Sequence, residues 1–147
     1  EGLWIGTDGD GLLRLTDAAY LCGTMSAALA MSLEYLGLRR QFGVPIGSFQ
    51  ALQHRAADCH VQVASAKALV KEAASALGTP RARFAAAASI HRAKAAALHV
   101  AKENIQFHGA IGFADEHDAG MYLRRAMVVA ARHSDSMQAL RERGSIA

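Results

Sequence analysis

The stretch LLRLTDAAYLCGTMSAALAMSLEYL, residues 12–36, decides the fold of this protein. Its apolar or small residues recur at alternating steps of three and four. That spacing places them on one face of an α-helix, because the helix turns once in 3.6 residues. The stripe consists of Leu12, Leu15, Ala19, Cys22, Ser26, Leu29, Leu33 and Leu36. We therefore expect one long helix that packs its stripe against other helices.

Two further stretches show the same period. One stripe covers residues 49–77 and is followed by Gly78, a residue typical of the position just after a helix. The other covers residues 84–105 and follows Thr79 and Pro80, which are typical of an N-cap and a first helical position. The sequence thus predicts three long helices joined by short connections.

The remaining segments predict one loop and two shorter helices. Residues 41–50, QFGVPIGSFQ, contain two glycines and a proline and are expected to form a loop, with Ser48 as the N-cap of the second helix. A fourth helix is expected over residues 118–127 and a last one between Ser134 and Gly144. Because short turns make successive helices antiparallel neighbours, the predicted fold class is all-α, an up-down four-helix-type bundle.

Length and composition limit the kind of protein this is. The chain has 147 residues, of which 52% are hydrophobic and 20% charged, so we expect one globular domain over residues 1–147, with residues 1–8 as a flexible lead-in. The net charge is +3 and the basic residues are scattered along the chain. No nucleic-acid-binding motif accompanies them, so no nucleic-acid partner is expected.

Cysteines, histidines and the N-terminus point to a cytoplasmic protein without a metal. Cys22 and Cys59 lie in apolar periodic stretches and are expected to be core residues in a reducing compartment. The histidines show no pair with the spacing of a helical metal site. No leader peptide is visible. The longest uncharged run, residues 18–33, falls short of the roughly 20 residues of a membrane span, so no membrane partner is expected.

Two segments break the helical pattern in ways that suggest a ligand. Residues 38–46 place Arg39 and Arg40 beside Phe42 at a helix end, and residues 106–113 form a turn that contains glycines. Guanidinium groups, glutamine amides and backbone N–H groups near glycine are good donors to a phosphate. The alternative interpretation is a solvated helix end and an ordinary turn, and spacing alone does not decide between the two.

The same segments resemble the acyl-CoA dehydrogenases. Residues 35–58, YLGLRRQFGVPIGSFQALQHRAAD, match the family pattern Y-x3-R-x-x-F-G-x-P-I-x-x-F-Q-x-x-Q-x-x-x-A-D. Residues 105–113, IQFHGAIGF, resemble the family turn Q-x-x-G-G-x-G-F, and residues 122–129, YLRRAMVV, resemble the L-x-R-D-A helix after it. The motifs occur in the family's order. The resemblance covers essentially the whole chain, but only the family's C-terminal helical domain.

The resemblance implies an FAD site shared between subunits, and hence a homo- or hetero-oligomer that takes FAD and acyl-CoA. The family's arginine at the position of Arg39 binds the flavin pyrophosphate of a neighbouring subunit, and its aromatic residue at Phe42 packs on the same cofactor. Its glutamine at Gln106 and the following turn meet the adenosine and pyrophosphate end. Ala110 replaces the second glycine of the pair, so its methyl group crowds this contact. The cofactor-binding candidates are Arg39, Gln41, Phe42, Gln106, Gly109, Ala110 and Asp135.

The position of the family's catalytic base is the main departure. In the family a glutamate removes the α-proton of an acyl-CoA thioester while a hydride leaves the β-carbon for the flavin. Counting from Gln106, that glutamate position falls on His133, and the position used by some branches falls near Leu13, beside Arg14. Neither residue is a carboxylate, so His133 is the catalytic candidate by position only.

Three interpretations of this departure stay open, besides a misaligned loop. His133 could itself act as a base near neutral pH, as some flavin monooxygenases of the superfamily place histidines near the flavin. Asp135 could serve instead. In the interpretation that we favour, the chain is a silent subunit that lends Arg39, Phe42 and Gln106 to the flavin of an active partner. The expected function is FAD-dependent α,β-dehydrogenation of an acyl-CoA in fatty acid metabolism, with the isolated chain inactive.

Overall fold

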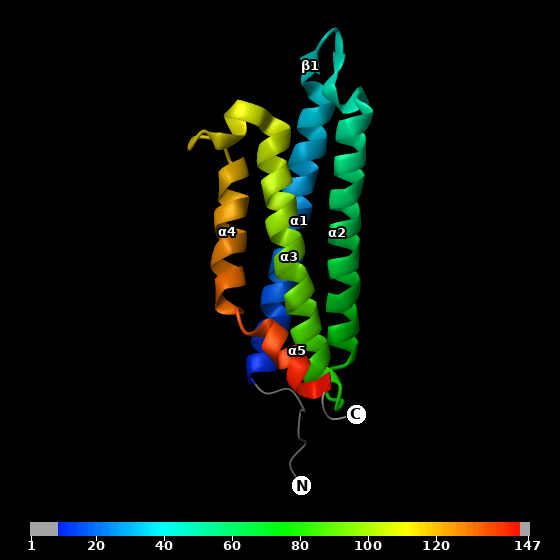
Figure 1. The fold of residues 1–147 in the computed structure, drawn as a ribbon, viewed down its shortest axis with the longest axis vertical. Helices are drawn as coiled ribbons and strands as arrows, with labels where there is room; N and C mark the ends of the chain where they lie inside the picture. The colour runs from blue at the N-terminus through cyan, green and yellow to red at the C-terminus, as the bar shows by residue number, and fades with distance from the viewer. Residues whose placement is uncertain (1–8, 145–147) are drawn as a thin grey trace.

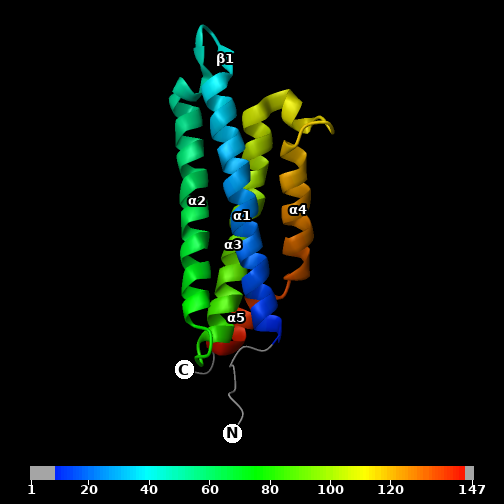
Figure 2. The ribbon, with the colours of Figure 1, turned by 180° about the vertical axis from the view of Figure 1, so that it is seen from behind.

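The computed structural model describes residues 9–144, in which long helices run up and down beside one another (Figures 1 and 2). At 1.5 Å per residue the three long helices measure roughly 40–45 Å, and α4 roughly 21 Å. The helices are α1 (Gly9–Leu38), α2 (Gln50–Ser75), α3 (Ala82–His108), α4 (Ala119–Arg132) and α5 (Ser136–Gly144). The all-α up-down bundle predicted from the sequence is confirmed.

Helix α3 is the centre of the bundle. It packs against α1, α2, α4 and α5, and Figure 1 shows it between α4 and α2. Most of its buried side chains are alanines, whose small size lets the neighbouring helices approach closely. The buried alanines of α3 are Ala82, Ala85, Ala86, Ala87, Ala93, Ala96, Ala97 and Ala101.

The buried face of α1 differs in part from the predicted stripe. Leu15 and Leu29 are buried as expected, but Leu12 and Leu33 are each 51% exposed. The face instead includes Arg14, Ser32 and several residues between the predicted ones. Because α1 packs against α2, α3 and α4, its buried face is wider than one stripe of large apolar residues.

The predicted loop over residues 41–50 is a small hairpin followed by a turn of 3-10 helix. Strand β1 (Arg40–Gln41) pairs with β2 (Val44–Pro45) in antiparallel register, and η1 (Ile46–Ser48) leads into α2. Ser48 is not the N-cap, because its hydroxyl donates to the Pro45 carbonyl oxygen at 2.7 Å. Apolar spacing carries no information about so short a strand pair, so the sequence pattern missed it.

The ends of two other helices differ from the prediction. Helix α3 begins at Ala82, after a turn in which the Arg81 N–H donates to the Thr79 hydroxyl oxygen at 3.3 Å. Helix α4 extends to Arg132, five residues beyond the predicted Met127. Two alanines and two valines in this extension are compatible with helix once the segment packs against α3.

By length and composition alone, α1 is long and apolar enough to cross a membrane. This is weak evidence, since the core helix of a soluble protein passes the same test. In the described part of the chain α1 packs against three other helices.

Candidate functional site

The hairpin holds an aromatic ring in solvent at one end of the bundle. Its two turn residues, Phe42 and Gly43, have φ angles of 51° and 82°, as a type I′ turn requires. A positive φ is uncommon for a bulky residue and is energetically unfavourable. Phe42 is 92% exposed, and its ring meets that of Phe49 edge-on, with 6.2 Å between ring centroids. The turn therefore holds Phe42 in a strained backbone conformation, with most of its side chain exposed to solvent.

Arg39 lies between α1 and the hairpin, with its backbone fixed on both sides. Its N–H donates to the Tyr35 carbonyl oxygen and its own carbonyl oxygen accepts from the Ile46 N–H, both at 2.8 Å. The side chains of Arg39 and Gln41 are exposed, and within residues 9–144 neither has a hydrogen bond or an ion pair. Both are free to bind an acceptor from outside the chain.

The glycine turn lies at the same end of the bundle. Gln106 is exposed in the last turn of α3, and Gly109 has a φ of 64° where the chain leaves the helix. The turn then continues as η2 (Gly109–Phe113), in which Ala110 is exposed. A Cβ atom on Gly112 would lie 2.5 Å from the Ile105 carbonyl oxygen, so only glycine allows η2 to fold back on α3.

A stack of rings joins the hairpin side to the glycine turn. His108 is buried, its Nδ1–H donates to the Asn104 carbonyl oxygen at 2.7 Å, and its ring lies 4.4 Å from that of Tyr35, one turn before Arg39. On its other side His117 lies 4.6 Å away between ring centroids. The predicted phosphate-binding segments are therefore held at one end of the fold.

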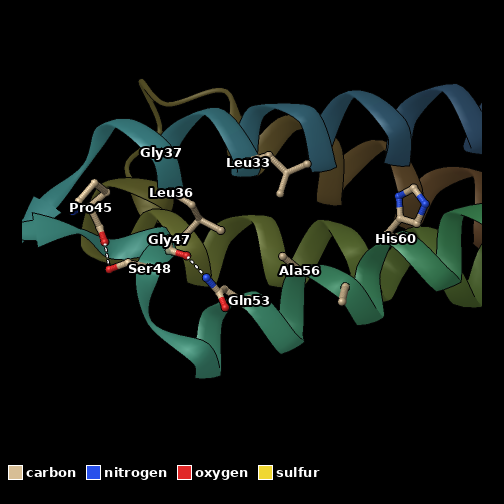
Figure 3. A pocket seen from close by; sticks show the side chains of 10 residues that line it. Leu33, Leu36, Gly37, Pro45, Gly47, Ser48, Gln53, Ala56 and His60 are labelled. Carbon is tan, nitrogen blue, oxygen red and sulfur yellow. Dashed lines mark hydrogen bonds between the residues drawn. The ribbon is translucent and has the colours of Figure 1, made fainter.

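A hollow of about 680 Å³ opens beside the hairpin (Figure 3). Leu33 and Leu36 of α1 and Ala56 of α2 line it, and the Gln53 amide donates to the Gly47 carbonyl oxygen at 3.0 Å. Its volume lies within the range of small-molecule sites. The hairpin end thus combines an exposed ring, an unpaired guanidinium and an apolar hollow.

His133 and Asp135 lie at the other end of the bundle, where α4 gives way to α5 (Figure 1). About 21 Å of α4 separates that end from the glycine turn. His133 is 2% exposed, and its Nε2 lies 2.8 Å from the Asp17 carboxylate of α1. Its carbonyl oxygen accepts from the Lys94 ammonium at 2.6 Å. The ring is therefore already paired inside the protein.

Asp135 is bound by the buried Arg14. From the sequence, Arg14 was noted only because it follows Leu13, and no role was predicted for it. Arg14 is 5% exposed and donates to Asp135 at 2.7 Å and to Asp10 at 2.8 Å. The hydrogen bond from Arg14 lowers the pKa of Asp135. Burial by itself lowers the pKa of Arg14, but the two carboxylates outweigh it and raise this pKa. Its Nη1 atom is buried without a partner in the described residues.

The structure thus separates the candidates into two groups. Within one chain it brings Arg39, Gln41 and Phe42 to the same end as the glycine turn, and it leaves His133 and Asp135 far from them. Asp17 was missed, although an acidic residue within an apolar stretch of helix is a signal for a buried pair. Among residues 9–144 no group of three or more His, Cys, Asp or Glu side chains is arranged to hold a metal ion.

Comparison with known proteins gives one consistent result. Residues 11–131 match the family described as "Acyl-CoA dehydrogenase, C-terminal domain". The chain is 43% identical over 109 residues to acyl-CoA dehydrogenase IpdE2 of Mycolicibacterium smegmatis, a match that covers 74% of this chain and 34% of that protein.

Two solved structures resemble the fold. Butyryl-CoA dehydrogenase from Megasphaera elsdenii matches with a TM-score of 0.82 and 30% identity, over 86% of this chain and 34% of that one. A chain of the ChsE4–ChsE5 complex from Mycobacterium tuberculosis matches with a TM-score of 0.84 and 29% identity, over 92% and 37% of the two chains. The chain spans about a third of the length of the relatives that it matches.

Proposed function

The chain belongs to the acyl-CoA dehydrogenase family, and from this premise we propose that it supplies the hairpin half of an FAD site in an assembled acyl-CoA dehydrogenase. The observation that carries the proposal is a pair of exposed residues at the hairpin: Phe42, which is 92% exposed, and Arg39, whose guanidinium has no partner within residues 9–144. In a solitary protein both would be of little use to the fold. The other half of the site belongs to another polypeptide chain.

The residues present fit part of this cofactor. The guanidinium of Arg39 and the amides of Gln41 and Gln106 can donate to a diphosphate, and the ring of Phe42 can pack on an aromatic system. Ala110 is exposed at the surface of the glycine turn, so its methyl group narrows the space through which the cofactor would approach the turn but does not close it. FAD, when bound, accepts the hydride that leaves the β-carbon of an acyl-CoA thioester. The residues of this chain bind and orient it.

A binding experiment tests this proposal. We expect the 147-residue chain to bind FAD weakly, at submillimolar to millimolar concentration in equilibrium dialysis, because it has only half of the site. Arg39→Ala removes a charge-assisted hydrogen bond and should raise the Kd about tenfold. Arg81→Ala is the matched control, because Arg81 pairs with Glu72 on the exposed surface, in the connection between α2 and α3. Figure 1 shows this connection at the end of the bundle opposite the hairpin.

Three results would contradict the proposal. They are an unchanged titration in Arg39→Ala, no binding at millimolar FAD, and tight stoichiometric binding by the chain alone. Light scattering adds a separate check, since a half-site requires an oligomer. A strict monomer at micromolar concentration, alone and with FAD, would count against a homo-oligomer and leave a second polypeptide as the partner.

The second candidate function is that of a non-catalytic subunit. Burial of His133 and its contact with Asp17 support it, because a base must reach a substrate proton and this ring is 2% exposed. We infer that His133 holds α4 against α1 and that the base belongs to a partner chain. One of the similar structures is that of a complex of two proteins, ChsE4 and ChsE5. Acyl-CoA dehydrogenation and a cytoplasmic location are proposed for the assembled protein only.

A further inference from the structure

An open groove of about 470 Å³ lies between α3 and α4, on a part of the bundle that neither candidate function uses. Figure 1 shows the two helices side by side along the whole of α4. The walls are apolar and include Leu98 and Ala95 of α3 and Met127 and Ala130 of α4. Alanines on both helices leave the space open, because no larger side chain fills it.

Two basic side chains, Lys94 and His91, also line the groove. Residues 91–98 of α3 span about 10 Å along the helix. Lys94 uses one of its three N–H groups to donate to the His133 carbonyl oxygen at 2.6 Å. His91 Nδ1 lies 3.2 Å from the Ser136 hydroxyl. The groove therefore has a polar part and an apolar part.

The ammonium of Lys94 lacks a counter-ion. Among residues 9–144 no carboxylate forms an ion pair with it, and the nearby Asp135 is already bound to Arg14. Burial lowers the pKa of Lys94 and the charge of Arg14 adds to this, whereas the nearby Asp135 carboxylate acts in the opposite direction. The charged form of Lys94 is therefore partly desolvated. Burial also lowers the pKa of His91, and the charge of Lys94 acts in the same direction, which favours the neutral ring. The groove thus has one positive charge to neutralise.

From this arrangement we propose that the groove binds an amphiphilic monocarboxylate, with its carboxylate on the Lys94 ammonium and its aliphatic tail along Leu98 and Met127. One cation matches one anion, and a partly desolvated ammonium gains more from a counter-ion than a hydrated one does. The apolar walls gain from covering an alkyl chain, whose first carbons follow the roughly 6 Å of α3 between Lys94 and Leu98. The alkyl chain of a neutral amphiphile can also cover the apolar walls, but such a molecule brings no counter-ion for the Lys94 ammonium.

The test uses the 147-residue chain with octanoate and with octanol as the uncharged probe. We expect octanoate to bind saturably in isothermal titration calorimetry and to shift the NMR methyl signals of Met127 and Leu98. The affinity for octanol should be lower by about tenfold or more, because a charge-assisted hydrogen bond is lost.

Two variants examine the polar and the apolar part separately. Lys94→Met should weaken octanoate binding about tenfold, and Lys102→Met, an exposed lysine two turns along the same helix, should leave it unchanged. Ala95→Phe places a ring in the groove from an exposed position, so it should block both probes while the helical circular dichroism is retained. This second variant decides the matter if Lys94→Met alters the fold.

The proposal is overturned if octanoate fails to bind saturably, if octanol binds equally well, or if octanoate binding survives both Lys94→Met and Ala95→Phe. Because the groove lies apart from the hairpin, these results leave the FAD proposal untouched. Retention of octanoate binding in Arg39→Ala would show the independence of the two sites.

Discussion

At the hairpin end, the Arg39 guanidinium is exposed and unpaired in the described chain, whereas at the α4–α5 end the Arg14 guanidinium is buried and bonded to two carboxylates. The aromatic and imidazole rings differ in the same way. Phe42 is 92% exposed in a strained turn, and His133 is 2% exposed and paired with Asp17. Groups satisfied inside a chain stabilise its fold, and groups left exposed are available to a ligand or a partner. The difference supports the proposal that the hairpin end binds a ligand or partner, and that the α4–α5 end stabilises the fold.

The largest effect on stability is expected from a substitution of Arg14, at the α4–α5 end. Arg14→Met should lower the free energy of unfolding by about 2 kcal/mol, because it removes the shared partner of Asp10 and Asp135. Loss of a fully buried pair costs more, but both carboxylates are about half exposed and regain water. Urea unfolding followed by circular dichroism measures the change.

Arg81→Met is the control for this substitution. Arg81 also pairs with a carboxylate, Glu72, but both side chains are more than half exposed. Exposed pairs contribute little, so the change should stay below about 0.5 kcal/mol. Equal effects of the two substitutions would show that the ion pairs of Arg14 contribute no more to stability than an exposed ion pair does.

A smaller effect is expected at His133, and it separates stability from catalysis. His133→Gln should lower the free energy of unfolding by about 1 kcal/mol, since the amide keeps only part of the contact with Asp17. The kcat of the assembled dehydrogenase should not change. A fall in kcat of more than about tenfold with stability retained would instead make His133 the base, and the two ends of the bundle would share the chemistry.

The smallest effect has the opposite sign and is expected at Phe42. Phe42→Asn should raise the free energy of unfolding by about 0.5 kcal/mol, because Asn-Gly suits a type I′ turn in which Phe adopts a φ of 51°. The same variant should bind FAD more weakly than the parent chain in equilibrium dialysis. Phe84→Asn, an exposed phenylalanine in ordinary helix, should show neither change. If Phe42→Asn is destabilising, the turn is not strained.

Much of the fold was predictable from residue spacing. The periods of three and four located α1, α2 and α3, and Gly78 marked the turn between the last two, where its φ is 78°. The motif residues Arg39 and Gln106 were found from sequence resemblance, and the structure places both at one end of the bundle. The hairpin was missed because so short a strand pair shows no apolar periodicity. The last turn of α4 was missed because its apolar residues are also compatible with other structures until the segment packs against α3.

The pairing of polar side chains could not be predicted in the same way. Asp17 and His133 are 116 residues apart, and Arg14 and Asp135 are 121 apart. Nothing in the local sequence around either partner indicates the other, because the contact exists only after α4 has packed against α1. The sequence could therefore name His133 as a base by position, but it could not show that the ring is buried.

The sequence by itself determined the helices, their order and the family to which the chain belongs, because helical period, turn residues and motif spacing are local properties of the chain. Only the tertiary structure decided which polar groups are free and which are satisfied. That outcome depends on how helices pack side by side, and packing brings together residues that the sequence holds far apart.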